Sequence, residues 1–165
     1  MEVVQKLNEN NENMNSFFKE NGIIYRKYSR ENSMIMKDKN RDDHKSWKRF
    51  CRGLIINPND NSIIAVPPVK SYECTKEEFF SGEINDSLII QELVEGTMIN
   101  MYYHNDQWNY STRSSIGLKN KWDNKKSFHE MLQDCEKIQT DFMDKELNYS
   151  FVLRHVDNRI VTPVY

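Results

Sequence analysis

Residues 87–117 constrain the fold of this chain more than any other stretch, because aromatic and β-branched runs alternate there with short polar breaks. Such a pattern is typical of consecutive antiparallel strands. The strands it predicts cover residues 88–90, 98–103 and 107–113. Gly96 stands between the first two, and a glycine there lets a ligand approach the backbone because it has no Cβ. An ordinary β-meander with a glycine bulge fits the same pattern.

Residues 50–66 predict a second hairpin. Arg52 and Gly53 stand at the mouth of an apolar strand that ends at Ile56, and dense turn chemistry follows it. The returning strand ends at Pro67-Pro68, because proline cannot donate to the ladder. Lys70 lies on an extended exit from this hairpin.

Helices are expected in other parts of the chain. Residues 1–20 are expected to form short helical segments, and Thr75 with Glu78 predicts a short capped helix. Residues 125–143 predict one amphipathic helix. Its apolar positions are Phe128, Met131, Leu132, Cys135, Ile138 and Phe142. Strands at 149–153 and 159–162 would complete a single α+β domain over residues 1–165, with largely antiparallel central sheets and flanking helices.

Composition limits the class of protein. The chain is 38% hydrophobic and 29% charged, with a net charge of −2, which is a soluble globular balance. No apolar run approaches the roughly 20 residues needed to span a bilayer, so no membrane partner is expected. The cysteines are three and widely spaced, which argues against a zinc site or a disulfide framework and favours an intracellular, cytoplasmic location.

Basic side chains lie near glycine, proline or turn positions. Arg52, Lys70 and Arg113 do so, and Arg159 is a fourth candidate. Converging Arg and Lys suit a triphosphate, because Arg offers a planar fork and Lys a point charge. Glu95 can accept hydrogen bonds from a ribose hydroxyl. We interpret the tryptophans as core or rim anchors rather than as stacking platforms: Trp47, Trp108 and Trp122.

The order of several motifs adds a family resemblance. They are Cys51-Arg52-Gly53-Leu54-Ile55-Ile56, Pro68 with Lys70, Glu95-Gly96-Thr97, Thr112-Arg113-Ser114-Ser115-Ile116-Gly117 and Asn158-Arg159-Ile160-Val161. In this order the chain resembles the phage-type ATP-dependent RNA ligases over about residues 45–165. It resembles more closely the short RNA-ligase-like proteins of large DNA viruses. The resemblance implies the nucleotidyltransferase fold, an ATP-grasp-like adenylation domain, and a viral protein acting in RNA repair in an infected cell.

The resemblance also implies a cofactor and a site. In that family a lysine attacks the α-phosphate of ATP, and the adenylate then passes to an RNA 5′-phosphate. ATP with Mg²⁺ is therefore the implied cofactor, with the metal held by phosphates and water, and RNA ends are an implied partner. The implied nucleotide-binding residues are Arg52, Gly53, Lys70, Glu92, Glu95, Gly96 and Arg113, where Lys70 matches with a register slip of one. No metal-binding residue is predicted.

The sequence departs from the family pattern at the nucleophile. The family lysine stands three residues before the motif glycine, and here that position is Leu93. Leucine has no nucleophilic atom, so lysyl-adenylate chemistry is expected to be lost. Val152 stands where the phage enzymes keep a carboxylate, and the sequence stops at Tyr165, before the family's later Lys-x-Lys element.

Three functions therefore stay open. The first is an RNA-ligase-like pseudoenzyme that binds a nucleotide, and RNA as an extension of that role. The second is a fragment or variant of an active RNA ligase that joins 5′-phosphate and 3′-hydroxyl ends. The third is a non-catalytic scaffold. Lysine at position 93 or a downstream Lys-x-Lys strand in a longer reading frame would favour the second.

Overall fold

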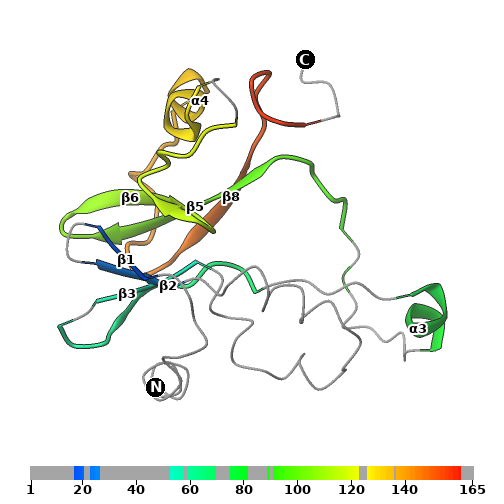
Figure 1. The fold of residues 1–165 in the computed structure, drawn as a ribbon, viewed down its shortest axis with the longest axis horizontal. Helices are drawn as coiled ribbons and strands as arrows, with labels where there is room; N and C mark the ends of the chain where they lie inside the picture. The colour runs from blue at the N-terminus through cyan, green and yellow to red at the C-terminus, as the bar shows by residue number, and fades with distance from the viewer. Residues whose placement is uncertain are drawn as a thin grey trace.

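A computed structural model describes residues 17–20, 23–26, 53–57, 59–69, 75–81, 89, 91–122, 126–135 and 137–160 of the chain. Within these residues the fold is mixed α+β, with two four-stranded antiparallel sheets and two short helices (Figure 1). The strand order is β1-β2-β3-β4 in the first sheet and β7-β6-β5-β8 in the second. This confirms the predicted α+β class and its antiparallel pairing.

The first sheet contains β1 (Phe17–Glu20), β2 (Ile23–Arg26), β3 (Leu54–Ile56) and β4 (Ile63–Ala65). The predicted β3–β4 hairpin is confirmed. Its turn closes where the Asn57 amide donates to the Ser62 carbonyl at 2.9 Å, and Asn61 has a positive φ of 58° that asparagine tolerates. The helical prediction for the N-terminal region is wrong at residues 17–20, which form β1 and pair with β2.

The second sheet contains β5 (Thr97–His104), β6 (Gln107–Thr112), β7 (Ser115–Ile116) and β8 (Tyr149–Leu153). The predicted β5–β6 hairpin and β8 are confirmed. Asn105 and Asp106 turn the hairpin with φ of 52° and 57°. Positive φ at both central residues gives a turn whose twist matches that of the flanking strands.

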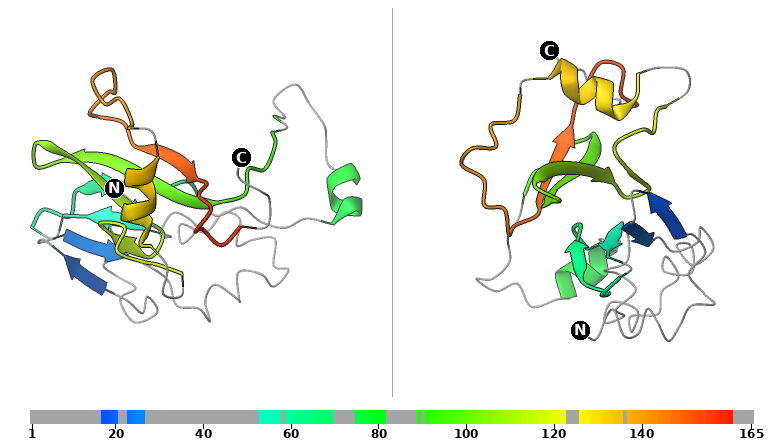
Figure 2. Two further views of the ribbon diagram at one scale, coloured as in Figure 1. Left: turned by 90° about the horizontal axis from the view of Figure 1, so that it is seen from above. Right: turned by 90° about the vertical axis from the view of Figure 1, so that its left-hand side faces the viewer.

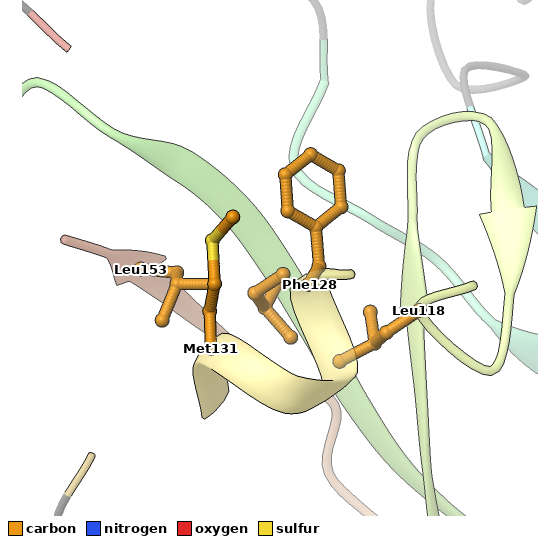
Figure 3. Packing of buried hydrophobic residues seen from close by; sticks show 5 residues of the cluster. Leu118, Phe128, Met131 and Leu153 are labelled. Atoms are coloured by element: carbon orange, nitrogen blue, oxygen red, sulfur yellow. The ribbon is translucent and has the colours of Figure 1, made fainter. Parts of the chain in front are cut away.

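The second sheet forms the middle layer of the described fold, with the first sheet on one side and helix α4 on the other (Figures 1 and 2). On the first side, Tyr102 and Ile116 pack against Ile55 and Ala65. On the second side, α4 packs on β5 and β8 (Figure 3). The buried residues of that cluster are Ile99, Leu118, Phe128, Met131 and Leu153. Helix α3 (Lys76–Ser81), which the sequence predicted, lies apart from both sheets.

Helix α4 (Phe128–Asp134) is much shorter than the predicted helix at 125–143. It begins with a capping box, in which the Glu130 amide donates to Ser127 Oγ at 3.2 Å and the Ser127 amide donates to Glu130 Oε2 at 2.7 Å. The second bond lowers the pKa of the Glu130 carboxyl. The helix ends at Cys135, whose ψ of 168° is extended. Phe142, predicted to be on the buried face, is 89% exposed, so the later apolar residues lack the burial that would stabilise more turns.

Ion pairs and hydrogen bonds tie the helix to the segment after β8. The Asp134 carboxylate lies 2.5 Å from Lys126 Nζ and 3.2 Å from His155 Nε2. The bond to Lys126 is the main reason that the pKa of Asp134 is lowered. The contact with His155 therefore ties the C-terminal end of the helix to the segment after β8, and the pair with Lys126 links the two ends of the helix.

Two predicted strands are wrong where the structure describes them. Ile89, from the apolar run at 88–90, lies outside any strand and is 78% exposed. Residues 159–160, predicted to begin the last strand, are a bend and an irregular position. Residues 161–162 of that strand lie outside the described residues.

Candidate functional site

A cleft of about 540 Å³ opens at the end of the second sheet where β5 begins and β6 ends. Its walls come from residues 67–69 after β4, 96–98 and Asn100 of β5, 112–114 after β6, 120–122, and Phe128 of α4. Segments distant in sequence therefore converge on one site, as is usual for ligand sites on a rigid scaffold. Its volume lies in the range of small-molecule sites.

Gly96 lines the cleft, and the structure gives a packing reason for this glycine. A Cβ at this position would lie 2.6 Å from the Leu153 carbonyl oxygen and 2.7 Å from Val152 Cγ1. Real Cβ atoms do not approach other atoms so closely. Only glycine therefore fits at this position, where the chain that enters β5 lies against β8. The space that the missing side chain leaves is thus used by β8.

The charge of the cleft is positive. Arg113 and Lys121 line it, and both side chains are exposed. Its described walls include no Asp or Glu. The Ser114 amide donates to Thr112 Oγ1 at 3.2 Å, which holds the turn that carries Arg113. Glu130 lies outside the walls and interacts electrostatically with Lys121, so Arg113 is the wall cation that most favours an anionic group at the mouth of the cleft.

An aromatic wall stands beside these cations. Trp122 and Phe128 both line the cleft, and their rings meet edge to face with centroids 6.2 Å apart. The Arg159 guanidinium lies 5.8 Å from the centre of the Trp122 ring, a cation–π distance. In Figure 3 the ring of Phe128 extends away from helix α4. Trp122 is 38% exposed, so part of its surface is accessible to a ligand.

Asn158 fixes the segment that carries Arg159. This side chain is buried, with an exposed fraction of 4%. Its Nδ2 donates to the Leu153 carbonyl at 2.8 Å, and its Oδ1 accepts from Thr97 Oγ1 at 3.1 Å and from the Arg159 amide at 2.9 Å. The Asn158-Arg159 pair of the sequence thus has a clear structural role, because it joins the end of β8 to the start of β5.

Polar side chains also lie deep in the cleft. Asn100 is 4% exposed, and its Oδ1 accepts from Ser150 Oγ on β8 at 2.9 Å. The Oδ1 atom of Asn120 is buried and has no hydrogen-bond partner within the part of the chain that the structure describes. Asn120 is held by its backbone, whose carbonyl accepts from the Phe128 amide at 2.9 Å.

The structure brings two of the residues predicted for the nucleotide site, Gly96 and Arg113, into this cleft. Glu92 is exposed and Glu95 is half-buried, and neither is part of its walls. Gly53 is buried before β3 with a φ of 94°, a backbone conformation that favours glycine. Arg52 and Lys70 lie outside the described residues, although their sequence neighbours Gly53 and Val69 lie within them.

The two departures from the family pattern are both described. Leu93 is 95% exposed in the irregular segment before Gly96 and does not line the cleft. Val152 is 41% exposed on β8 and lies opposite the cleft residue Met98 in the strand register. An apolar pair, Met98 and Val152, therefore occupies this position of the sheet.

Sequence analysis did not predict several cleft residues. Lys121 was not singled out, and Trp122 was interpreted as a structural anchor. Asn100 gave one usable signal, because it interrupts the apolar run of residues 98–103 with a polar side chain. Its burial depends on strands that are distant in sequence, so this signal alone does not identify a site.

Comparisons with protein-family models, with curated proteins and with solved structures each give no significant match. Within the described residues, no helix has both the length and the apolar character needed to cross a membrane.

Proposed function

We propose that this chain is an RNA-ligase-like nucleotidyltransferase domain that binds ATP in the cleft and has lost lysyl-adenylate chemistry. The observation that carries the proposal is the combination of Arg113, Lys121 and Trp122 around one cleft at Gly96. Gly96 and Arg113 belong to separate motifs of the family resemblance. That both line one cleft supports the shared role which the resemblance implies for them.

The chemistry of the cleft fits the parts of a nucleotide. Arg113 and Lys121 are exposed cations that suit the phosphates, and Trp122 offers an aromatic surface for a base. Mg²⁺ would arrive with the phosphates and keep several waters. RNA ends are a further proposed ligand, because a 5′-phosphate makes the same demand on the two cations.

The position of Leu93 supports the loss of covalent chemistry. Attack on the α-phosphorus needs an amine within roughly 3–3.5 Å and in line with the leaving pyrophosphate. A leucine side chain, exposed to 95% and outside the cleft walls, offers neither the atom nor the approach. The Val152–Met98 pair likewise supplies no charge to the reacting phosphate.

Replacing Arg113 by alanine is expected to weaken binding of Mg·ATP about tenfold or more, because a hydrogen bond to a charged group is lost. Isothermal titration calorimetry at fixed ionic strength measures this. The control is Lys145→Ala, which removes the same charge near Tyr103, where the Lys145 ammonium lies 4.5 Å from the ring centre. Equal loss in both variants would indicate a general charge effect and would count against a phosphate site at Arg113.

The unmodified chain is expected to form no covalent AMP adduct. Incubation with α-labelled ATP and Mg²⁺, followed by a denaturing gel, measures this directly. Leu93→Lys supplies the missing amine, and a labelled band on this variant would show that residue 93 reaches the bound nucleotide from its exposed position outside the cleft walls. A labelled, acid-labile band on the unmodified chain would instead reveal another nucleophile and favour an active RNA ligase.

A further inference from the structure

Asn100 is a buried carboxamide on the wall of the cleft, and the roles assigned above do not use it. It is 4% exposed, while its neighbours in β5, Ile99 and Met101, are fully buried on the opposite face of the strand. A buried amide costs free energy unless its hydrogen-bonding groups are satisfied. The partners of this side chain therefore decide its role.

One half of the Asn100 amide is satisfied by the protein. Ser150 lies directly opposite Asn100 in the register of β8 and β5, and its hydroxyl donates to Asn100 Oδ1 at 2.9 Å. This bond uses Oδ1 and does not involve Nδ2, the donor atom of the carboxamide. The bond from Ser150 fixes the orientation of the carboxamide, so Nδ2 is the group available to a ligand in the cleft.

Depth sets which part of a nucleotide can reach Asn100. Arg113 and Lys121 are exposed, whereas Asn100 is nearly fully buried. Phosphates are strongly hydrated anions, so they pair with the exposed cations at the mouth. The uncharged end of the ligand then enters the interior, where a donor such as Nδ2 selects for an acceptor.

We propose that Asn100 is a specificity-determining residue of the cleft, whose Nδ2 donates to a ring nitrogen of the bound adenine while Ser150 positions the carboxamide. This inference rests on the proposed function, because it assumes that a nucleotide occupies the cleft. It adds an orientation to that function: the base lies at Asn100 and the phosphates lie at Arg113 and Lys121. No covalent step is involved.

The first test uses the unmodified chain and changes only the ligand. The acceptors of adenine are its ring nitrogens, so 1-deaza-, 3-deaza- and 7-deaza-ATP remove them singly. One of these analogues is expected to bind about tenfold more weakly than ATP, because the hydrogen bond from Nδ2 to that ring nitrogen is then lost. If all of them bind as tightly as ATP, no ring nitrogen is read and the inference is overturned.

The second test changes the protein. Asn100→Leu keeps a similar volume and removes the donor, so ATP is expected to bind about tenfold more weakly, while tripolyphosphate, which has no base, changes by less than about twofold. The sensitive deaza analogue and ATP should then bind this variant equally. Ser150→Ala is a milder variant at an exposed position, and it is expected to weaken ATP binding less and leave tripolyphosphate binding unchanged.

The outcomes separate the two proposals. If the unmodified chain binds neither ATP nor tripolyphosphate, the proposed function fails and this inference fails with it. If the unmodified chain binds ATP but Asn100→Leu binds it equally well, only the role of Asn100 is overturned. Equal weakening of ATP and tripolyphosphate by Asn100→Leu also overturns it, because the loss would then lie in the whole cleft. Thermal unfolding of each variant confirms that it is folded.

Discussion

Gly96→Ala is expected to lower the free energy of unfolding by about 3 kcal/mol, because the added methyl group has no space and overpacking alone costs 1–3 kcal/mol. Its Cβ would lie 2.6 Å from the Leu153 carbonyl oxygen, and β8 backbone would have to move. Urea denaturation followed by circular dichroism measures the loss. Because β8 also carries Ser150, which donates to the cleft residue Asn100, the variant should bind ATP more weakly as well.

Gly117→Ala is the matched control for this substitution. Gly117 also has a positive φ, 76°, but its nearest atom to an added Cβ is a flexible Lys119 carbon at 3.6 Å. Alanine there meets only the strain of its backbone conformation, about 1 kcal/mol. Similar losses at both positions would show that backbone conformation, and not the approach of β8, requires glycine at position 96.

Met131→Ala is expected to remove about 3 kcal/mol of stability, because it deletes a fully buried side chain from the layer between α4 and the second sheet. A helix as short as α4 is not stable alone in water, so its helical structure depends on this packing. The variant should therefore lose helical signal at lower denaturant concentration than the parent chain.

Gln133→Ala tests the same helix without touching its buried face. Gln133 is exposed on α4, so the substitution should change the free energy of unfolding by no more than about 0.5 kcal/mol. Equal destabilisation by both substitutions would mean that the loss at Met131 does not come from its burial, and it could not come from helix propensity either, because alanine is the better helix former. The packing of Met131 would then be a minor contribution.

Local sequence signals predicted the hairpins well because each is decided by adjacent residues. Turn chemistry at Asn105-Asp106 and the aromatic runs beside it specify β5 and β6 without help from distant parts of the chain. Strand β8 was predicted with the bounds that the structure has. These elements position Gly96 and Arg113, the two predicted site residues that meet in the cleft.

Signals that depend on distant partners were less informative. The apolar spacing at 125–143 continues for several turns. The helix nevertheless ends with α4, whose buried residues are the ones that pack on the second sheet. Cleft residues such as Lys121 and Asn100 acquire their roles from neighbours on other strands, and no local pattern specifies those neighbours. The sequence therefore predicts the elements that adjacent residues decide. It does not predict features that depend on packing against elements distant in sequence.

The long-range hydrogen bonds of β8 have a consequence for the order of folding. The bond between Ser150 and Asn100 spans 50 positions, and the bond between Thr97 and Asn158 spans 61. The β5–β6 hairpin closes a short loop and forms without either bond, whereas docking of β8 requires a much longer loop to close. The wall residues Asn100 and Thr97 are therefore held in place only when β8 and the segment after it dock, and a bound nucleotide would selectively stabilise the docked state over one in which the hairpin alone has formed.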